Sequence, residues 1–230
     1  MKWVVPEIWK GSNVWIIGGG PSITEELSIP KDIVAAVLSG TLPISSYEPY
    51  FHSLYTKHVI GINIAFMIAD WFDMIYFGDD KFFTKYQFEL YQYPNLCVSN
   101  ATNTKDVPWV KYLAKHPKGT GISPLKTTVC WNQNSGAAAI SVAASAGAKR
   151  IFLMGFDMDN LSGVSHWHGK YKRAVLKDGT MKPPPYARHK SGFSAIAHDA
   201  KKMGIQIINV SPKSTIKEFP KMTFKEAIAL

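Results

Sequence analysis

The chain has 230 residues, 46% of them hydrophobic, and a formal net charge of +9 at pH 7. This length and composition predict one globular domain over residues 1–230, built around one substantial core. No apolar run approaches the roughly 20 residues of a membrane-spanning helix. The N-terminal residues also lack the apolar stretch of a signal peptide. These features argue against a helical membrane protein and predict a soluble, cytoplasmic protein.

The positive charge is densest between Lys149 and Lys221. A basic surplus favours acidic partners, such as nucleotides, nucleic acids or anionic glycans. The sequence contains no helix-turn-helix, zinc-finger or RNP-like pattern that would specify a nucleic-acid reader. A solvated basic face therefore stands beside a nucleic-acid surface as an interpretation of this charge.

Short apolar runs alternate with helix-like runs along the chain. Strands are predicted at residues 14–17, 59–63, 73–77, 96–99, 151–154 and 206–210. Helices are predicted at residues 135–146 and 192–203, each ending at a glycine and leading into a strand. Nearly continuous apolar strands indicate burial on both faces. The pattern predicts an α/β protein with a Rossmann-like, doubly wound and mostly parallel sheet.

Two stretches do not fit this alternation. Residues 28–58 look like an insertion between the first two strands. Residues 159–191 look like a long irregular loop with several glycines and three consecutive prolines. Irregular segments of this length in a compact domain are usually binding loops, lids or disordered. We therefore expect a lid-like loop over residues 159–191.

A glycine-rich turn follows the first predicted strand and consists of Gly18, Gly19, Gly20, Pro21 and Ser22. Such a turn can offer several backbone N–H groups to a phosphate, with help from the positive end of a following helix. The turn matches neither G-x-G-x-x-G nor a Walker A loop. A tight strand-to-helix turn without a ligand is the alternative interpretation, because glycine is the usual residue of strained turns.

Other strand ends also carry polar or small residues, and ligands of doubly wound sheets collect at those ends. The candidates are Asn63, Asp79, Asp80, Asn134, Ser135, Gly136, Asp157 and Ser214. Asn63 either contacts a ribose or base edge or caps a turn. Asp79 and Asp80 either hold Mg²⁺ or begin a helix, whose first turn favours acidic residues.

Three histidines lie in or beside the basic loop, namely His166, His168 and His189. A neutral histidine near pH 7 can take a proton from an acceptor hydroxyl. His189 precedes a predicted helix, which is a good position for a fixed base, and a surface histidine is the alternative. No third ligand accompanies His166 and His168, so a zinc site is not predicted.

Five motifs, in this order, resemble those of a known superfamily. They are Ile-Ile-Gly-Gly-Gly-Pro-Ser (16–22), Gly-Ile-Asn-Ile-Ala-Phe (61–66), Asp-Met-Ile-Tyr-Phe-Gly-Asp-Asp (73–80), Asn-Ser-Gly-Ala-Ala-Ala (134–139) and Arg-Ile-Phe-Leu-Met-Gly-Phe-Asp-Met (150–158). The superfamily joins bacterial lipooligosaccharide sialyltransferases, flagellin-modifying motility accessory factors and archaeal-type hydroxymethylpterin pyrophosphokinases, with short members in phages. The resemblance runs from Val14 to about Ser214.

The sialyltransferases of this superfamily have a Rossmann-like fold and use a CMP-sugar donor without a cofactor. The resemblance implies that residues 18–22 approach the donor phosphate and ribose, that Asn63 contacts the nucleotide, and that residues 134–136 line the cytidine or the sugar. It also implies that His189, followed by the Ser-Pro-Lys-Ser turn at 211–214, is the general base. Asp157 is the second catalytic candidate.

One feature departs from the sialyltransferases, which place tyrosines after the Gly-x-Asp strand to stabilise the leaving phosphate. This chain has Met158 and Asp159 there. The candidates for phosphate or acceptor contacts are His166, His168, Tyr186, Arg188 and Ser214, with Tyr171 as a further substitute for the tyrosines.

Three functions follow as hypotheses. The favoured one is a glycosyltransferase-like enzyme that moves a sugar from a nucleotide-sugar donor of CMP type to a hydroxyl of a glycan or modified DNA, with a phage origin as one option. The second is an Mg²⁺-dependent nucleotide pyrophosphokinase or phosphotransferase that uses Asp79 and Asp80. The third is a non-catalytic module that binds nucleotides or nucleic acids.

Overall fold

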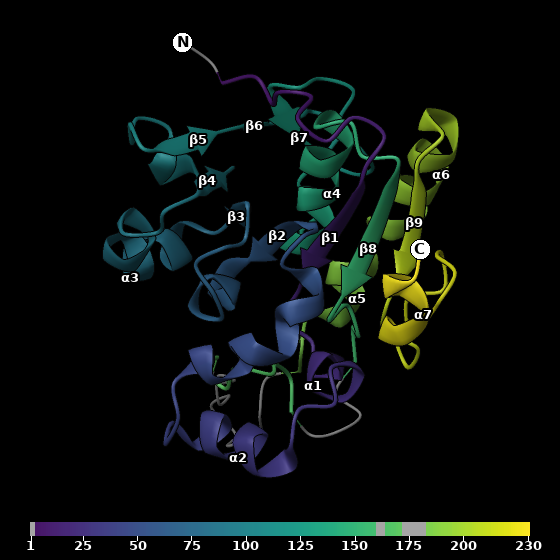
Figure 1. Ribbon diagram of the computed structural model, residues 1–230. Coiled ribbons are helices and arrows are strands. Elements are labelled where there is room, and N and C mark those ends of the chain that lie inside the picture. Colours follow the sequence, from purple (N-terminus) through teal and green to yellow (C-terminus); the bar gives the residue numbers. More distant parts are fainter. Residues whose placement is uncertain (1–2, 160–163, 172–182) are drawn as a thin grey trace.

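A seven-stranded sheet forms the centre of the protein in the computed structural model, which describes residues 3–159, 164–171 and 183–230 (Figure 1). All neighbouring strands are parallel, in the order β5-β4-β3-β2-β1-β8-β9. The strands are β1 (Asn13–Ile17), β2 (His58–Ile62), β3 (Met74–Phe77), β4 (Leu96–Ser99), β5 (Val110–Tyr112), β8 (Arg150–Met154) and β9 (Gln206–Asn209). The α/β class and the parallel sheet are confirmed.

The sequence missed only short strands of the described structure. β5 has three residues with a lysine in the middle, so no apolar run marks it. β6 (Ala114–Lys115) and β7 (Thr128–Val129) form a separate two-stranded ladder of two residues each. Strands this short bury too few side chains to leave a periodic signal.

The strand order changes direction beside β1, which has β2 on one side and β8 on the other. The register pairs Ile17 of β1 with Met154 of β8. The turns that follow these two strands therefore lie side by side at the carboxyl edge of the sheet. This is the topological switch point, where ligands of doubly wound sheets bind.

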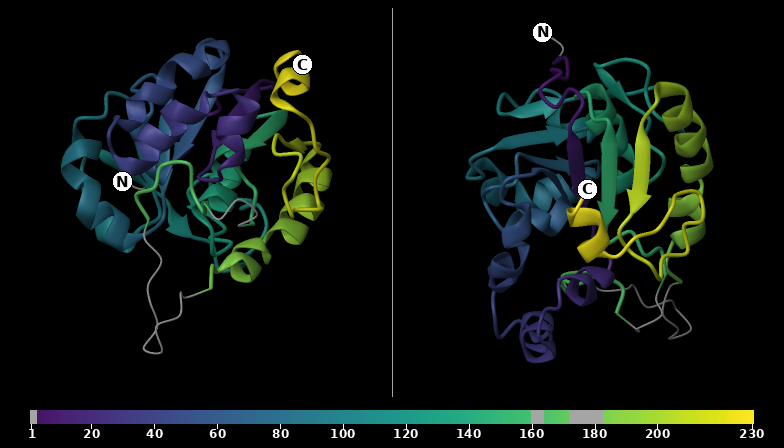
Figure 2. Two further views of the ribbon diagram at one scale, coloured as in Figure 1. Left: turned by 90° about the horizontal axis from the view of Figure 1, so that it is seen from below. Right: turned by 45° about the vertical axis from the view of Figure 1, so that its right-hand side comes forward.

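One face of the sheet is covered by α4 (Ser135–Ser145) and α6 (Phe193–Met203), and other helices cover the opposite face (Figure 2). Residues along β1 alternate between the two cores, as a strand requires: Val14 and Ile16 face α4, whereas Trp15 and Ile17 face the other layer. The small side chains of α4 let this helix lie close to the strands, as the sequence predicts.

The opposite face carries the connection between β1 and β2. It contains α1 (Ser22–Glu26), α2 (Lys31–Ser39) and the 3-10 segment η1 (Ile44–Leu54). Residues 28–58, expected as an insertion, are thus the crossover layer itself, and Tyr47, Phe51 and Leu54 are fully buried there. Pro49 within η1 imposes an irregular spacing on these apolar residues. The apolar residues therefore lack the helical periodicity by which a helix is recognised in a sequence.

The remaining described helices are α3, which has 12 residues, and several short segments. They are η2 (Asn63–Met67), α3 (Asp80–Tyr91), η3 (Thr102–Thr104), α5 (Tyr186–Lys190) and α7 (Phe224–Ile228). α3 was left open by the sequence, and its N-cap is Asp79, so the helix-start interpretation of the two aspartates is confirmed. Within the described residues, no helix has both the length and the apolar character needed to cross a bilayer.

The predicted lid-like loop is described only in part, because residues 160–163 and 172–182 lie outside the described residues. Residues 164–171 are held against the turn after β1 by Trp167, which is 1% exposed. Its indole Nε1 donates to the Gly18 carbonyl at 2.8 Å, and its backbone N–H donates to the Gly19 carbonyl at 3.1 Å. The Tyr47 hydroxyl donates to the Trp167 carbonyl at 3.3 Å. This segment is therefore docked on the sheet edge.

Candidate active site

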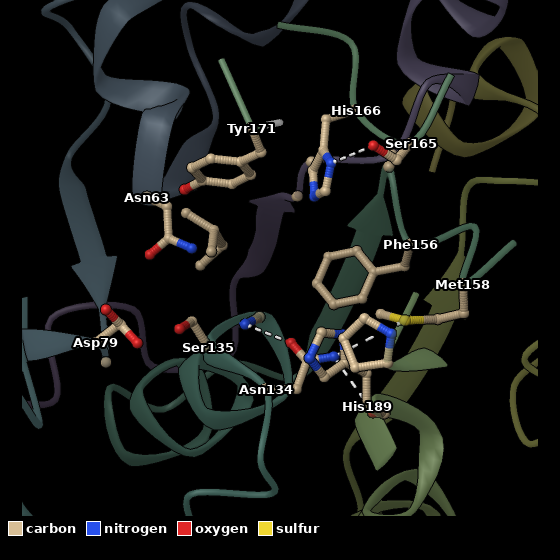
Figure 3. A pocket seen from close by; sticks show the side chains of 18 of the residues that line it. Asn63, Asp79, Asn134, Ser135, Phe156, Met158, Ser165, His166, Tyr171 and His189 are labelled. Atoms are coloured by element: carbon tan, nitrogen blue, oxygen red, sulfur yellow. Dashed lines mark hydrogen bonds between the residues drawn. The ribbon is translucent and has the colours of Figure 1, made fainter. Parts of the chain in front are cut away.

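A cavity of about 570 Å³ opens at the carboxyl edge of the sheet, beside the switch point (Figure 3). Its wall includes most residues singled out from the sequence: Gly18, Gly19, Gly20, Asn63, Asp79, Asn134, Ser135, Gly136, Asp157, His166, His168, Tyr186, Arg188 and His189. These residues come from seven separate parts of the chain, so their convergence is a property of the fold.

Four singled-out residues, Pro21, Ser22, Asp80 and Ser214, are not part of this wall as described. The Ser22 hydroxyl donates to the Ser211 hydroxyl at 2.9 Å in a buried position. The Ser214 hydroxyl donates to the Phe156 carbonyl at 2.6 Å. Both serines therefore fasten the turns beneath the cavity and do not face a ligand.

The glycine turn does not present the open row of N–H groups that its sequence suggests. Three of its amides already donate to protein acceptors: Gly18 to the Met154 carbonyl at 2.7 Å, Gly20 to the Gly155 carbonyl at 2.8 Å, and Ser22 to Asp157 Oδ2 at 3.0 Å. The helix that follows, α1, has only five residues. The turn is thus joined to the turn after β8, and these amides do not form a free phosphate cradle.

The glycines instead allow other parts of the protein to approach. A Cβ atom on Gly20 would lie 2.3 Å from Asp157 Oδ2, and one on Gly19 would lie 2.7 Å from Cδ2 of His166. A Cβ on Gly136, at the start of α4, would lie 2.7 Å from the Phe156 ring. Absence of a side chain at these positions is therefore required for packing around the cavity.

Asp157 is a buried carboxylate that links the two turns. Its Oδ2 accepts the Ser22 N–H, whereas Oδ1 is buried without a hydrogen-bond partner in the described structure. Burial raises the pKa of Asp157, and hydrogen bonds from Ser22 and Ser211 oppose that rise. A half-satisfied carboxyl in a cavity wall has capacity left for a ligand donor.

Asp79 and Asp80 diverge. Asp79 lines the cavity and its Oδ1 accepts the Phe82 N–H at 2.9 Å as the cap of α3. Oδ1 of Asp80 accepts the Asn103 N–H at 3.3 Å, away from the wall. Over the described ranges, no group of three or more His, Cys, Asp or Glu side chains is arranged to hold a metal ion.

Asn63 begins η2 directly after β2 and reaches the cavity (Figure 3). Its backbone φ is 50°, a left-handed conformation that asparagine tolerates better than most residues. Its Oδ1 atom is buried and has no hydrogen-bond partner among the described residues. A strained residue with an unsatisfied oxygen at a cavity is a good candidate for ligand contact.

Asn134 connects the start of α4 to His189, which lies beside it in the cavity wall (Figure 3). Its Oδ1 accepts the N–H groups of Gly136 at 2.9 Å and Ala137 at 3.3 Å, which makes it the N-cap of α4. Its Nδ2 donates to the His189 carbonyl at 3.3 Å. Both polar atoms of the Asn134 amide are thus hydrogen-bonded, and the nitrogen holds the backbone of His189 in place.

His189 lies in α5, a five-residue helix that ends just before α6, and it lines the cavity. Burial is the main cause that lowers the pKa of His189 below its ordinary value of 6.5, and the nearby Arg188 charge lowers it further. The imidazole is therefore neutral at pH 7. A neutral imidazole at a cavity wall can accept a proton.

The docked loop contributes an aromatic cluster to the same cavity. The His166 ring centroid lies 5.1 Å from that of His168 and 4.9 Å from that of Tyr171, which it meets edge-on. Burial lowers the pKa of His166 to about 4 and that of His168 to about 3. Nδ1 of His168 accepts the Lys170 N–H at 3.0 Å, so this neutral ring carries its proton on Nε2.

Several residues of the wall were not proposed from the sequence as site residues. They include Phe82, Lys85, Tyr86, Trp131 and Met158. Gln133 and Met158 have φ values of 52° and 51°, which are rare for such side chains. The aromatic and basic residues of α3 needed that helix to be recognised first.

The fold is similar to that of solved sialyltransferase structures. The sialyltransferase CstII from Campylobacter jejuni, in complex with the substrate analogue cytidine-5'-monophosphate, matches with a TM-score of 0.53 and 16% identity, over 93% of this chain and 86% of that one. The CstII complex with CMP-3FNeuAc matches with a TM-score of 0.50 and 14% identity, over 92% and 86%. The chain therefore has a sialyltransferase-like α/β fold. No protein-family model and no curated protein matches the sequence.

Proposed function

We propose that this protein is a glycosyltransferase that moves a sugar from a nucleotide-sugar donor of CMP type to an acceptor hydroxyl. The observation that carries the proposal is one cavity at the switch point, where Asn63, the start of α4 and His189 converge. A sialyltransferase-like fold supports the donor class, because the similar structures contain CMP and CMP-3FNeuAc.

In this proposal the nucleotide lies between Asn63 and the start of α4. The side-chain amide of Asn63 lies at the edge of this space and is suited to hydrogen-bond a polar group of the nucleotide. Ser135 and Gly136 line the same space at the helix N-terminus, whose positive end favours the phosphate. The glycine turn lines the cavity and limits its shape, because most of its amides already donate hydrogen bonds within the protein.

The transfer is a direct displacement with His189 as general base. His189 removes the proton of the acceptor hydroxyl while the acceptor oxygen forms a bond to the anomeric carbon. The bond between that carbon and the phosphate oxygen breaks, and CMP leaves with the electron pair. The lowered pKa of His189 supports the role, because the ring must be neutral to take the proton.

The docked loop supplies groups for the leaving phosphate. His166 lines the cavity next to Gly19, and its Nδ1 lies 3.0 Å from the Ser165 hydroxyl, which leaves Nε2 to face the cavity (Figure 3). Tyr171 and Arg188 also line the cavity. These donors take the place of the tyrosines that the sialyltransferase pattern puts after the Gly-x-Asp strand.

The test is CMP release from CMP-sialic acid in the presence of simple glycoside acceptors, followed by the mass of the product. Wild-type protein should release CMP and yield a product heavier by one sugar residue. The variant His189→Ala should still bind CMP and lose turnover, whereas His198→Ala, which changes an exposed histidine of α6, should keep it. Equal turnover in His189→Ala and wild type would show that this base assignment is wrong.

A further inference from the structure

Trp131 differs from the other tryptophans that anchor the core. Its side chain is 40% exposed and lines the cavity, whereas Trp9, Trp15 and Trp167 are almost fully buried. A large aromatic surface left open in a cavity wall is costly to hydrate. Such surfaces in proteins commonly mark ligand contacts.

The turn that presents Trp131 is strained and firmly held. Asn132 and Gln133 have φ values of 51° and 52°, two consecutive left-handed residues without glycine. The buried Asn132 side chain fixes this conformation: its Oδ1 accepts the Gly121 N–H at 2.7 Å, and its Nδ2 donates to the carbonyls of Gly121 and Cys130, each at 2.9 Å. The surroundings therefore enforce a conformation that the sequence alone disfavours.

The same turn is joined to the element that carries His189. A Cβ on Gly192, at the start of α6, would lie 2.5 Å from Oδ1 of Asn132, so these two segments are in close contact. Asn134 donates to the His189 carbonyl at 3.3 Å. The exposed indole and the proposed base are thus fixed relative to one another through two neighbouring residues.

The charges around Trp131 fit a single ring better than a polyanion. Lys115 Nζ lies 4.8 Å from the centroid of the indole and covers part of it. The nearby Lys118 is paired with Asp199, and Lys126 is paired with Glu7 at 3.1 Å. Nucleic-acid binding requires unpaired cations spaced along a backbone. Two of these lysines are instead neutralised.

We propose that Trp131 is the residue that determines acceptor specificity: the apolar face of an acceptor sugar ring stacks on its exposed indole, with Gln133 as hydrogen-bonding neighbour. The stacked ring would present a hydroxyl to His189 in a geometry set by Asn132 and Asn134. This inference deepens the proposed function and depends on it for the role of the bound ring.

The test titrates methyl β-galactoside, methyl β-glucoside, a methyl sialoside and a single-stranded oligonucleotide into the full chain, with and without CMP, by saturation-transfer NMR. Three variants are compared with wild type: Trp131→Ala, Trp131→Phe and Leu125→Ala. Leu125 is a matched control, since it is 52% exposed in the preceding turn and is not part of the cavity wall. Melting temperatures verify that each variant is folded.

We expect at least one glycoside to bind, with affinity about tenfold lower in Trp131→Ala, as the loss of one aromatic stacking contact implies. Trp131→Phe should retain most of the affinity, and Leu125→Ala should equal wild type. CMP affinity should stay the same in all three. If glycoside binding depends on Trp131 but CMP does not bind, the donor assignment is wrong and the stacking role of Trp131 is still supported.

Three results overturn the inference. One is unchanged glycoside affinity in Trp131→Ala. Another is the absence of glycoside binding to wild type, both with and without CMP. The third is Trp131-dependent binding of the oligonucleotide in place of the glycosides, which would make the indole a stacking platform for bases.

Discussion

Two turns border the cavity, and they contribute in opposite ways. The glycine turn at residues 18–22 has the more conspicuous sequence, yet three of its amides bond within the protein and its missing side chains make room for Asp157 and His166. The turn at residues 131–136 has no glycine before Gly136, yet it directs Trp131, Gln133 and Asn134 into the wall. The first turn supplies close packing, whereas the second supplies side-chain chemistry.

A glycine thus indicates that another group packs closely against the backbone, but it does not indicate whether that group is a ligand or part of the protein. At Gly20 the approaching group is Asp157, and at Gly136 it is Phe156. Left-handed residues that are not glycine carry a different message, because their strain must be offset by their surroundings. Substitutions in these two turns should therefore separate the effects of packing from those of side-chain chemistry.

The largest effect should come from the residue that the second turn holds in place. We expect His189→Ala to lower kcat by at least about 100-fold, the usual contribution of a general base, without changing CMP affinity. In wild type, kcat should rise with pH and level off with a midpoint below 6.5, because burial and Arg188 lower the pKa of His189. A midpoint above 6.5 would conflict with this environment.

Adjacent glycines of the first turn should respond differently to alanine. Gly20→Ala brings a Cβ to 2.3 Å from the Asp157 carboxylate and 2.7 Å from the Gly155 carbonyl, so overpacking should cost about 1–3 kcal/mol of unfolding free energy. Gly19→Ala meets the His166 ring at 2.7 Å and should displace the docked loop. Urea unfolding should show a loss of stability in Gly20→Ala, and an activity assay should show a loss of turnover in Gly19→Ala. If both variants lose stability and turnover to the same extent, the two glycines do not have different roles.

The docked loop should make stability depend on pH. Burial lowers the pKa of His168 to about 3 from 6.5, so the unfolded chain binds a proton that the folded chain excludes. Unfolding free energy should therefore fall as pH drops below 6.5, by up to about 1.4 kcal/mol per pH unit. His168→Gln should reduce this slope between pH 7 and pH 5, and the lowered pKa values of His166 and His189 should account for the slope that remains. An unchanged slope would mean that His168 is accessible to water.

The smallest effect should separate the two roles of Asn134. Asn134→Ser keeps an N-cap oxygen for Gly136 and Ala137 but loses the donor to the His189 carbonyl. We expect stability close to wild type and reduced turnover. Asn134→Ala removes both contacts and should also cost about 1 kcal/mol of stability. If both variants keep full turnover, the contact with His189 has no positioning role.

Much of the fold could be predicted from the sequence, because parallel strands leave unbroken apolar runs such as those of β1 and β8. The polar ends of these strands also indicated where a site would lie. The crossover layer at residues 28–58 was hidden because 3-10 geometry and Pro49 remove helical periodicity. Trp131 was hidden because an exposed indole at a cavity and a buried one have the same sequence appearance.

The state of the backbone amides could not be predicted either. Whether an N–H of Gly18 or Gly20 is free depends on where the turn after β8 lies, and only the folded sheet decides that. The divergence of Asp79 and Asp80 is similar, because the start of α3 sets the two carboxylates in different directions. Local sequence therefore identified the edge of the sheet where the site lies. Which donors and acceptors are free at that edge depends on the tertiary structure.

We claim that the cavity binds a cytidine nucleotide as part of a sugar donor. The most direct measurement is thermal unfolding with CMP, UDP, GDP, ATP and their sugar conjugates, each with and without Mg²⁺. CMP or a CMP-sugar at about 100 times its Kd should stabilise the protein by about 2.7 kcal/mol without requiring Mg²⁺. Stabilisation by ATP with Mg²⁺ alone, or by no nucleotide at all, would contradict the claim.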